Sequence, residues 1–352
     1  MSQVLGQIAA YNRVMKSSKT PLVLVTGATG FVGRHLVREL LRRGANVRAF
    51  GRNRDVLDAV EVAGAEAVTG DLRDSESVRG ACRGVSLVYH VGAFSAPWGD
   101  VREFEAVNVG GTRHVLDGCR AAGVGRLVYV SSPSVTFDGN DCIRQTESTP
   151  YPVRFVSPYS HTKKEGEDLV NIARGELETV IVRPKAVFGP GDTSLLPRLL
   201  RAARAKRLPQ IGTGNNRVDL TYVDNVVHAL LLAGESAAVG NTYTITNGDP
   251  GANAPCLWGV IGHVLASLRL PTIQRSVPLS VALALAGSAE AMAKITGREP
   301  FLTRYSALIL ARTQTYDISA ARRDLGYAPV VSLDEGLART IAALQNARGV
   351  AP

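Results

Sequence analysis

The chain has 352 residues, of which 45% are hydrophobic and 20% charged, and its formal net charge is +9. This length allows one large domain or two modest ones, and the composition excludes a disordered chain. A local concentration of cations has no interleaved aromatic residues, so we expect a solvated helix face and no nucleic-acid binding. A surface for anionic substrates or lipid headgroups is the remaining alternative. The cations are Arg198, Arg201, Arg204, Lys206 and Arg207.

The four cysteines, Cys82, Cys119, Cys142 and Cys256, form no CxxC pair. They predict free thiols in a reducing compartment, a cytoplasmic location and no metal site. Residues 1–20 lack the unbroken apolar run of a signal peptide and are interpreted as an N-terminal extension, either a short helix or a frayed leader.

From Pro21 to about Val182, β-branched runs alternate with amphipathic helical segments, which predicts an α/β fold with a Rossmann-type, doubly wound parallel sheet. The main predicted helices are Val32–Arg43, Val101–Ala122 and Tyr159–Ala173. The predicted strands are Leu22–Val25, Val47–Phe50, Ala67–Thr69, Leu87–Val91, Leu127–Val130 and Thr179–Val182, and Thr242–Thr246 is expected to rejoin the sheet.

Beyond Arg183 the alternation gives way to glycine- and proline-rich loops between helical segments. We therefore predict a smaller, mainly helical substrate-binding lobe, formed by residues 185–220 and 249–352. The dinucleotide-binding domain would comprise 21–184 and 221–248. Within the lobe, Leu279–Ala289 is too short to span a bilayer, and it either covers an apolar pocket or rests on a membrane.

A glycine-rich turn follows the first strand and opens the first helix, the context that a dinucleotide-binding turn requires. Its glycines allow a tight turn and close approach of a pyrophosphate, and the helix N-terminus supplies amide donors. The residues expected to bind the cofactor here are Gly27, Ala28, Thr29, Gly30, Phe31, Val32 and Gly33.

The second strand is followed by Arg52 and Arg54 in place of the acid that commonly holds the ribose hydroxyls of NAD. The two arginines suit a 2′-phosphate, which favours NADP(H) over NAD(H). Asp55 is the competing residue, because a small shift of the loop would present its carboxylate instead. Asp71 follows the third strand and is expected to meet the adenine amino group, with a helix cap as the alternative.

Ser157-Pro158 is a helix-start signal that places Tyr159 and Lys163 on one face of the first turns. An ammonium group beside a phenol lowers the pKa of that phenol, which would allow Tyr159 to exchange protons with a substrate oxygen. His161 falls on the other side of the helix and is interpreted as structural. His90, at the end of a strand, is interpreted as a packing residue.

Together with Asn108–Thr112, these motifs resemble an extended short-chain dehydrogenase/reductase. Three further segments match in order, at 130–135, 183–192 and 220–226. Within that superfamily the chain most resembles the 3β-hydroxysteroid dehydrogenase branch, and especially the bacterial 2-alkyl-3-oxoalkanoate reductases, through segments 132–136, 191–199, 300–304 and 321–327. The resemblance covers roughly Leu22 to the C-terminus.

The resemblance implies that Tyr159 is the proton donor or acceptor, that Lys163 lowers its pKa and holds the nicotinamide ribose, and that Ser132 binds the substrate oxygen. Ser131 would serve instead if the strand ended one residue earlier. The resemblance also implies a homodimer. Further cofactor residues that it implies are Leu72, Gly92, Ala93, Pro184 and Val187.

Sugar-nucleotide epimerases and dehydratases share these motifs, but they usually carry an arginine where this chain has Val218, with Arg217 one residue away. We therefore expect an apolar ketone or alcohol substrate, a 2-alkyl-3-oxoalkanoate or a 3β-hydroxysteroid-like compound. Lys185 and Ser134 are the candidate substrate residues, Lys185 because a cation there could pair with a carboxylate. An apolar wall is expected from Leu279–Ala286 and Leu308–Leu310. The alternatives are a sugar-nucleotide enzyme and an NADP(H)-sensing module without turnover, and peripheral membrane contact stays open.

Overall fold

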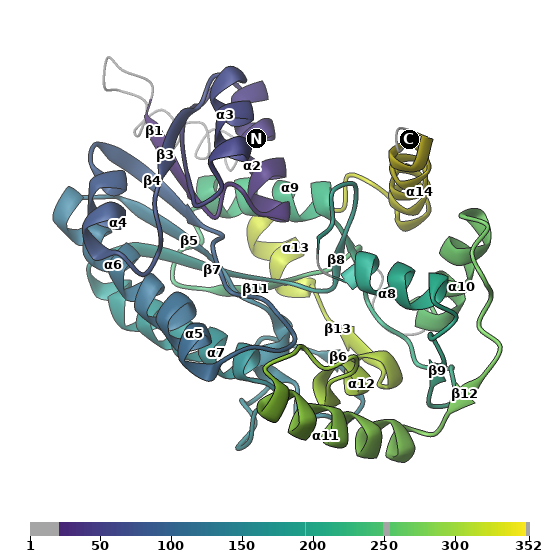
Figure 1. Cartoon of the computed structure of the whole chain (residues 1–352). Helices are drawn as coiled ribbons and strands as arrows, with labels where there is room; N and C mark the ends of the chain where they lie inside the picture. The colour runs from purple at the N-terminus through teal and green to yellow at the C-terminus, as the bar shows by residue number, and fades with distance from the viewer. Residues whose placement is uncertain (1–20, 194, 249–253, 350–352) are drawn as a thin grey trace.

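A computed structural model describes residues 21–193, 195–248 and 254–349, so the predicted N-terminal extension lies outside the described residues. The described chain forms a central sheet with helices on both faces and a second, mainly helical body beside it (Figure 1).

The central sheet has seven parallel strands in the order β11-β7-β5-β4-β1-β2-β3. The chain winds one way from β1 to β3 and the other way from β4 onward. Ligands of such sheets bind outside the carboxyl ends of the strands at this switch point. The predicted fold class is confirmed, including the strand that rejoins the sheet. The strands are β1 (Leu22–Thr26), β2 (Asn46–Gly51), β3 (Glu66–Thr69), β4 (Val85–His90), β5 (Arg126–Val130), β7 (Glu178–Pro184) and β11 (Thr242–Ile245).

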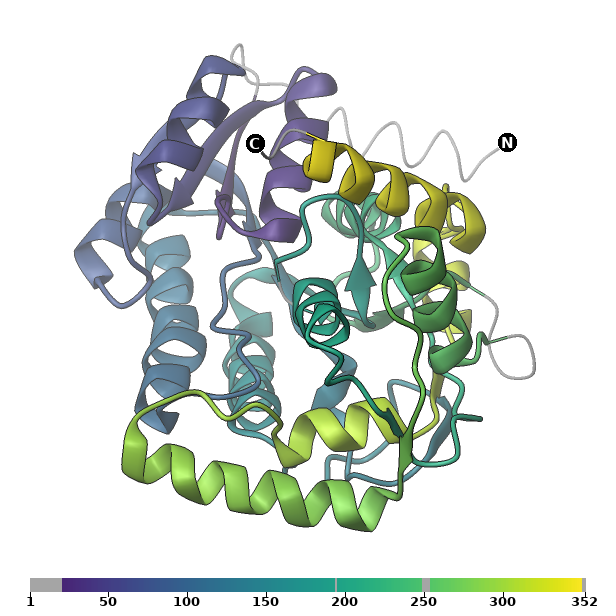
Figure 2. The ribbon, with the colours of Figure 1, turned by 45° about the vertical axis from the view of Figure 1, so that its right-hand side comes forward.

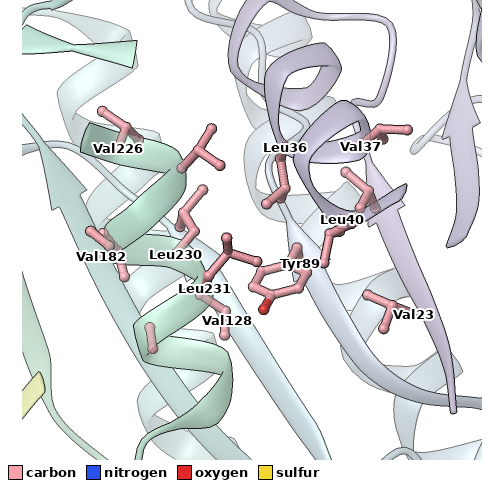
Figure 3. Close-up of a cluster of buried hydrophobic side chains, with 14 of the residues drawn as sticks. Val23, Leu36, Val37, Leu40, Tyr89, Val128, Val182, Val226, Leu230 and Leu231 are labelled. Atoms are coloured by element: carbon pink, nitrogen blue, oxygen red, sulfur yellow. The ribbon is translucent and has the colours of Figure 1, made fainter. Parts of the chain in front are cut away.

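One face of the sheet is covered by α2 (Phe31–Arg42), α3 (Arg54–Val62), α9 (Val223–Glu235) and α13 (Ser319–Leu325). Figure 3 shows Leu36 of α2 and Leu230 of α9 pointing toward Tyr89 and Val128 of the sheet, and all four residues are buried. Burial of each such aliphatic side chain stabilises the fold by roughly 1.5–3 kcal/mol. Although α13 falls within the predicted lobe, its Leu325 joins this core.

The other face is covered by α4 (Ser75–Cys82), α6 (Gly111–Ala122) and α7 (Pro158–Ile172). The single helix predicted at Val101–Ala122 is interrupted: α5 (Val101–Phe104) leads into a π-helical turn (Glu105–Gly110) before α6 begins. Such turns add a residue per turn and frequently lie at functional sites. This one buries Asn108, whose side chain bonds the backbone of Phe94 and the hydroxyl of Thr162. All four cysteines are free, as predicted.

The second body contains α8 (Leu195–Arg204), α10 (Leu257–Ser267), α11 (Leu279–Thr296), α12 (Arg304–Ala311) and α14 (Leu333–Gly349) around its own apolar core. Arg201 and Arg204 are exposed on α8, so the predicted solvated basic face is confirmed. Three two-stranded parallel sheets complete the fold. They pair β8 (Val187–Phe188) with β10 (Thr221–Tyr222), β9 (Gln210–Ile211) with β12 (Ser276–Val277), and β6 (Cys142–Gln145) with β13 (Gln314–Tyr316).

Candidate active site

The glycine-rich turn after β1 is packed too tightly for any side chain. A Cβ atom on Gly27 would lie 2.5 Å from the backbone of Gly92, and one on Gly33 would lie 2.1 Å from the carbonyl oxygen of Gly27. Gly27 also has a φ of +67°, a left-handed conformation that favours glycine. The turn therefore leaves backbone close to whatever lies above it, as a pyrophosphate requires.

Helix α2 begins directly from this turn. Its N-cap is Gly30, no side chain caps it, and its first turn contains no acidic residue. The backbone amides of that turn can therefore donate hydrogen bonds to an anion, and the positive end of the helix dipole attracts it. This arrangement fits a dinucleotide. Leu72, Gly92 and Gly111 pack together nearby, because Cβ atoms on the two glycines would lie within 3 Å of the Leu72 side chain.

The two arginines after β2 differ in how closely acidic side chains pair with them. Arg54 begins α3 and forms ion pairs with Asp58 at 2.6 Å and Glu61 at 2.8 Å. Arg52 is 65% exposed, and its nearest anionic partner is the Asp71 carboxylate at 3.9 Å. Arg52 is thus the arginine that remains free to meet a ligand at this end of the cleft, while Arg54 belongs to its own helix.

Asp71 is fixed by its neighbour. Its carboxylate accepts bonds from the backbone amide of Arg73 and from the guanidinium group of the same residue, and these bonds hold the pKa of Asp71 below its usual range. The N-cap of α4 is Asp74, so the alternative interpretation of Asp71 as a helix cap is wrong. Asp55 lies in the first turn of α3, where its charge suits the helix dipole.

The start of α7 agrees with its sequence. Ser157 is the N-cap, its hydroxyl accepts from the backbone amide of Ser160 at 3.1 Å, and Pro158 opens the helix. His161 is exposed and stacks on Phe155 with ring centroids 4.9 Å apart, which confirms that it lies away from the buried side of the helix. Lys163, on the other side, is 2% exposed.

Ser132 and Tyr159 come together at the carboxyl end of β5. Ser132 caps a short 3-10 helix (Pro133–Thr136), and its hydroxyl faces the phenol of Tyr159. Burial raises the pKa of Tyr159 to about 12, while the Ser132 hydroxyl opposes this rise. Ser131 is buried by contrast, and its hydroxyl finds no partner among the described residues. The geometry thus favours Ser132 of the two serines.

Lys163 is buried on the helix that carries Tyr159, and the lowering of the Tyr159 pKa by its charge stays a prediction. Its ammonium nitrogen lies 3.9 Å from the centre of the Tyr129 ring, and burial lowers the pKa of Lys163 to about 7, opposed by the carboxylate of Glu167. Glu167 is itself held by Arg183 in two bonds of 2.6 and 2.8 Å.

His90 is a packing residue, as predicted. Its ring nitrogens bond the hydroxyls of Thr26 at 2.7 Å and Thr112 at 3.1 Å, and burial lowers its pKa to about 3. The imidazole is therefore neutral at ordinary pH. Within the described residues, no group of three or more His, Cys, Asp or Glu side chains could hold a metal ion.

Lys185 follows β7 and points into the contact between the two bodies. It is 7% exposed, and its ammonium group donates to the side-chain oxygen of Gln314 at 2.6 Å. Burial lowers the pKa of Lys185 to about 8. The residue after it, Ala186, has a φ of +41°, so the chain turns sharply here. Within the described part of the chain, no carboxylate forms an ion pair with Lys185.

Two phenols that the sequence reasoning missed border the same space. Tyr305, on α12, faces the hydroxyl of Ser134 and is close enough to Tyr159 for a charge on that phenol to raise the Tyr305 pKa, which burial already raises. Tyr316, on β13, is 2% exposed, and its hydroxyl has no partner among the described residues. The Ser134 hydroxyl is buried in the same way. Buried polar atoms without partners are rare in folded proteins and call for an explanation.

An apolar pocket of about 60 Å³ opens into the core of the second body. It is bounded by the Ala186–Phe188 segment and by aliphatic side chains of α8, α10 and α14, such as Leu199, Ile261 and Leu337. No residue of Leu279–Ala286 lines this pocket. Leu279, Ala282 and Leu283 pack into the core of the second body, and the apolar wall for a substrate stays a prediction. That segment begins α11, where Val281 and Leu285 face outward.

Val218 is 2% exposed, and the Arg217 side chain donates to the backbone oxygen of Ala254 at 2.6 Å. The Arg217 side chain is therefore engaged by the backbone of Ala254. Asp219, the next residue, accepts the backbone amide of Tyr316 at 2.7 Å, and burial raises its pKa to about 6.

Comparison with known proteins agrees with this geometry. Residues 24–268 match the 3-beta hydroxysteroid dehydrogenase/isomerase family. A 2-alkyl-3-oxoalkanoate reductase of Stenotrophomonas maltophilia is 39% identical over 90% of this chain and 97% of its own length. A mouse sterol-4-alpha-carboxylate 3-dehydrogenase, decarboxylating, is 32% identical over 97% of this chain and 96% of its own length. Among solved structures, MoeE5 in complex with UDP-glucose and NAD superposes with a TM-score of 0.73 at 28% identity, covering 93% of this chain and 99% of MoeE5.

Proposed function

The chain belongs to the 3-beta hydroxysteroid dehydrogenase/isomerase family, and we propose that within this family it is an NADP(H)-dependent reductase of apolar β-keto acids. It is an oxidoreductase that acts on ketone and alcohol groups. The observation that carries the choice of substrate is the buried cation of Lys185, whose ammonium nitrogen lies 5.6 Å from the centre of the Tyr316 ring. The substrate class is a 2-alkyl-3-oxoalkanoate, or a 3β-hydroxysteroid-like compound that carries a carboxylate.

Tyr159 and Ser132 are the proposed catalytic pair at the substrate ketone. The nicotinamide, when bound, supplies the hydride. As the carbonyl oxygen gains negative charge, the two hydroxyl groups stabilise it as preorganised donors. Because its pKa is about 12, Tyr159 keeps its proton at neutral pH and can give it to the far more basic alkoxide oxygen.

Lys163 is the proposed partner of the nicotinamide ribose. Its amine is held against the Tyr129 ring at the end of the cleft near β4 and β5, so it needs no rearrangement of the backbone to donate to a hydroxyl. Gly27, Gly30 and Gly33 would hold the pyrophosphate through backbone amides, with Ala28, Thr29, Phe31 and Val32 completing the turn. Asp71, Leu72, Gly92, Ala93, Pro184 and Val187 are the remaining proposed contacts of the cofactor, with Asp71 at the adenine amino group.

NADP(H) is preferred to NAD(H) in this proposal because of Arg52. It is exposed, and the one anionic group near it among the described residues is the Asp71 carboxylate at 3.9 Å, so its guanidinium group can form a bidentate pair with a 2′-phosphate. Arg54, which the sequence offered equally, is engaged by two carboxylates of α3 and contributes less.

The carboxylate of the keto acid would bind to Lys185, with Ser134, Tyr305 and Tyr316 as hydroxyl donors around it. The buried Asp219 carboxylate acts electrostatically on Lys185 without forming a direct ion pair in the described chain, and a ligand carboxylate in contact with the ammonium group would stabilise the buried cation further. The relatives support this interpretation, since the names of the bacterial reductase and the mouse enzyme both describe carboxylates. The alkyl part of the substrate would lie toward the apolar pocket of α8, α10 and α14.

A sugar nucleotide is the less favoured substrate, although MoeE5 resembles this chain in fold. Val218 offers no charge to a diphosphate, and Arg217 is turned away toward Ala254. Residues 21–184 with 221–248 are the proposed dinucleotide domain, and 185–220 with 249–352 the substrate lobe. A homodimer through α6 and α7 and a cytoplasmic location complete the proposal.

NADPH consumption measured in parallel with 2-alkyl-3-oxoalkanoates, 3-ketosteroids and UDP-sugars tests this function. We expect turnover with the keto acids and none with UDP-sugars. If neutral 3-ketosteroids were turned over as fast as the keto acids, the proposed recognition of a substrate carboxylate would be wrong. An enzyme that retains NAD tightly and converts a UDP-sugar without net NADPH consumption would contradict the proposal as a whole.

A further inference from the structure

The outer face of α11 is apolar and exposed. Within the described residues α11 is the one helix long and apolar enough to cross a membrane, yet only 17% of its residues are buried. Figure 2 shows it along the outer edge of the molecule, with α12 on its inner side. A helix that is apolar on all sides is normally covered, either by protein or by lipid.

The exposed side chains share one line along the helix. Val281, Leu285, Met292 and Ile295 are spaced so that all four fall on one narrow face. They are 47%, 50%, 59% and 82% exposed, and Phe301, just beyond the helix, is 82% exposed. We call these five residues the α11 stripe. Apolar surface gathered in this way marks an interaction site, whereas scattered exposed residues need no explanation.

The inner side of α11 is already occupied. Ala282, Ala286 and Ala293 are buried there, and the bond from the Arg304 backbone amide to Glu290 at 2.7 Å ties α11 to the start of α12. The helix is therefore fixed along the surface of the protein. It suits a bilayer surface, where an apolar face enters the headgroup region while the helix lies flat.

The charges around the stripe are positive. Arg275, Lys294 and Arg298 are exposed and form no ion pair with any described residue. Segment 275–304 contains two acidic residues, and both are engaged. Their ion pairs are Glu290–Arg304 and Glu299–Arg198. Among the described residues of this segment, the charged groups without an ion-pair partner are therefore cations, and cations attract anionic headgroups.

We propose that the α11 stripe docks on an anionic lipid bilayer, with Arg275, Lys294 and Arg298 among the phosphate headgroups. A second copy of this chain fits less well, since two-fold symmetry would bring like charges together across the contact. Helix α12 connects the stripe to the site, because it follows α11 directly and carries Tyr305. Docking would place the proposed substrate lobe against the bilayer, in which an apolar substrate dissolves. The proposal rests on the surface alone and holds whatever the substrate is.

Flotation of the full chain with vesicles tests this docking. The vesicles would contain phosphatidylcholine with phosphatidylglycerol, or phosphatidylcholine alone. We expect binding to the anionic vesicles that weakens as salt is added. The double variant Leu285→Glu/Met292→Glu should lose at least about tenfold in partition. Lys294→Gln/Arg298→Gln should lose about tenfold toward anionic vesicles alone.

Val62→Glu is the matched control, since Val62 is 91% exposed on α3, outside the stripe. It should bind vesicles as the unaltered chain does, and all variants should keep their unfolding temperature. Vesicle binding that is absent, or unchanged in Leu285→Glu/Met292→Glu, would overturn the proposal. A loss of molecular mass in that variant without vesicles would also overturn it, because a second copy of the chain would then be what covers the stripe.

Discussion

The two ends of the cleft are built from different materials. At the nucleotide end the ligand surface is backbone: three glycines, a helix N-terminus without a side-chain cap, and one free arginine. At the proposed substrate end it is side chains from four separate segments: Lys185 lies near the Tyr316 ring, and Tyr305 faces the hydroxyl of Ser134. In a site formed by closely packed backbone, even one added methyl group displaces the chain. In a site formed by side chains, a residue can be replaced without moving the backbone, and the replacement changes which substrate binds. The difference explains how one framework can keep its cofactor while its substrate changes.

Tyr159, at the junction of the two ends, should give the largest effect. Tyr159→Phe removes the proton donor and should lower kcat for ketone reduction by about a thousandfold, with little change in the binding of NADPH. Tyr243→Phe is the control, because its hydroxyl lies in the core near Asp324, far from the cleft. Steady-state kinetics would measure both, and an unchanged kcat in Tyr159→Phe would remove the catalytic assignment.

The backbone character of the nucleotide end is tested at Gly33. A methyl group there would lie 2.1 Å from the carbonyl oxygen of Gly27, so Gly33→Ala must push the turn out of place. We expect the Kd for NADPH to rise by about a hundredfold. Gly80→Ala is the control, since a Cβ atom on Gly80 of α4 meets nothing within 4 Å. Equal NADPH affinities in the two variants, measured by fluorescence titration, would contradict this view.

At the substrate end Lys185→Met should separate acids from neutral ketones. Loss of a charge-assisted bond should raise KM for a keto acid by about thirtyfold, while KM for a neutral ketone of similar size should change little. Equal effects on the two substrates would show that Lys185 supports only the packing of the site.

The same residue predicts a pH dependence. Lys185 is a cation below its pKa of about 8 and loses that charge as the pH rises through this value. KM for a keto acid should therefore rise at alkaline pH, and a bound carboxylate shifts the rise to a higher pH because it stabilises the cation. KM for a neutral ketone should stay level over the same range, and so should KM for the keto acid in Lys185→Met.

Arg52→Ala should lower the preference for NADPH over NADH by about tenfold, because a bidentate pair with the 2′-phosphate is lost. Arg54→Ala is the matched control at the same end, and it should leave the preference nearly unchanged since Arg54 is paired within α3. The reverse order of effects would show that the loop rearranges around the cofactor.

The smallest effect is expected at Tyr305→Phe. Loss of one neutral hydroxyl near Ser134 should raise KM for the keto acid about fivefold and leave kcat nearly unchanged. Tyr327→Phe is a control with the same change, since its hydroxyl bonds the backbone oxygen of Thr246 away from the cleft. A large fall in kcat would instead make Tyr305 a proton donor in its own right.

Features that depend on residues adjacent in the sequence were predicted most accurately. Ser157-Pro158 and the glycine-rich turn fix local geometry through capping and close approach, so both agree with the structure. Tyr305 and Tyr316 were missed because only tertiary packing brings them to residues far earlier in the chain. No periodicity in the sequence carries that information.

Other differences have equally local causes that composition does not reveal. Arg54 appeared equivalent to Arg52 until its pairing with Asp58 and Glu61 was visible. The apolar run at Leu279–Ala289 is divided between two sides of α11: Leu283 packs against the core of the second body, whereas Val281 and Leu285 face outward. The positions of the alanines along α11 determine which side of the helix faces the protein, and mean hydropathy does not contain that information.

The central claim is net reduction of a ketone by this site, and isotope transfer tests it most directly. The enzyme would be incubated with a 2-alkyl-3-oxoalkanoate and NADPH deuterated at the transferable position, and the product analysed by mass spectrometry. The account predicts a hydroxy acid that carries one deuterium on the former carbonyl carbon, formed in step with NADP⁺ and absent with Tyr159→Phe. A keto acid that stays unchanged and unlabelled, while a UDP-sugar is converted without consumption of NADPH, would contradict it.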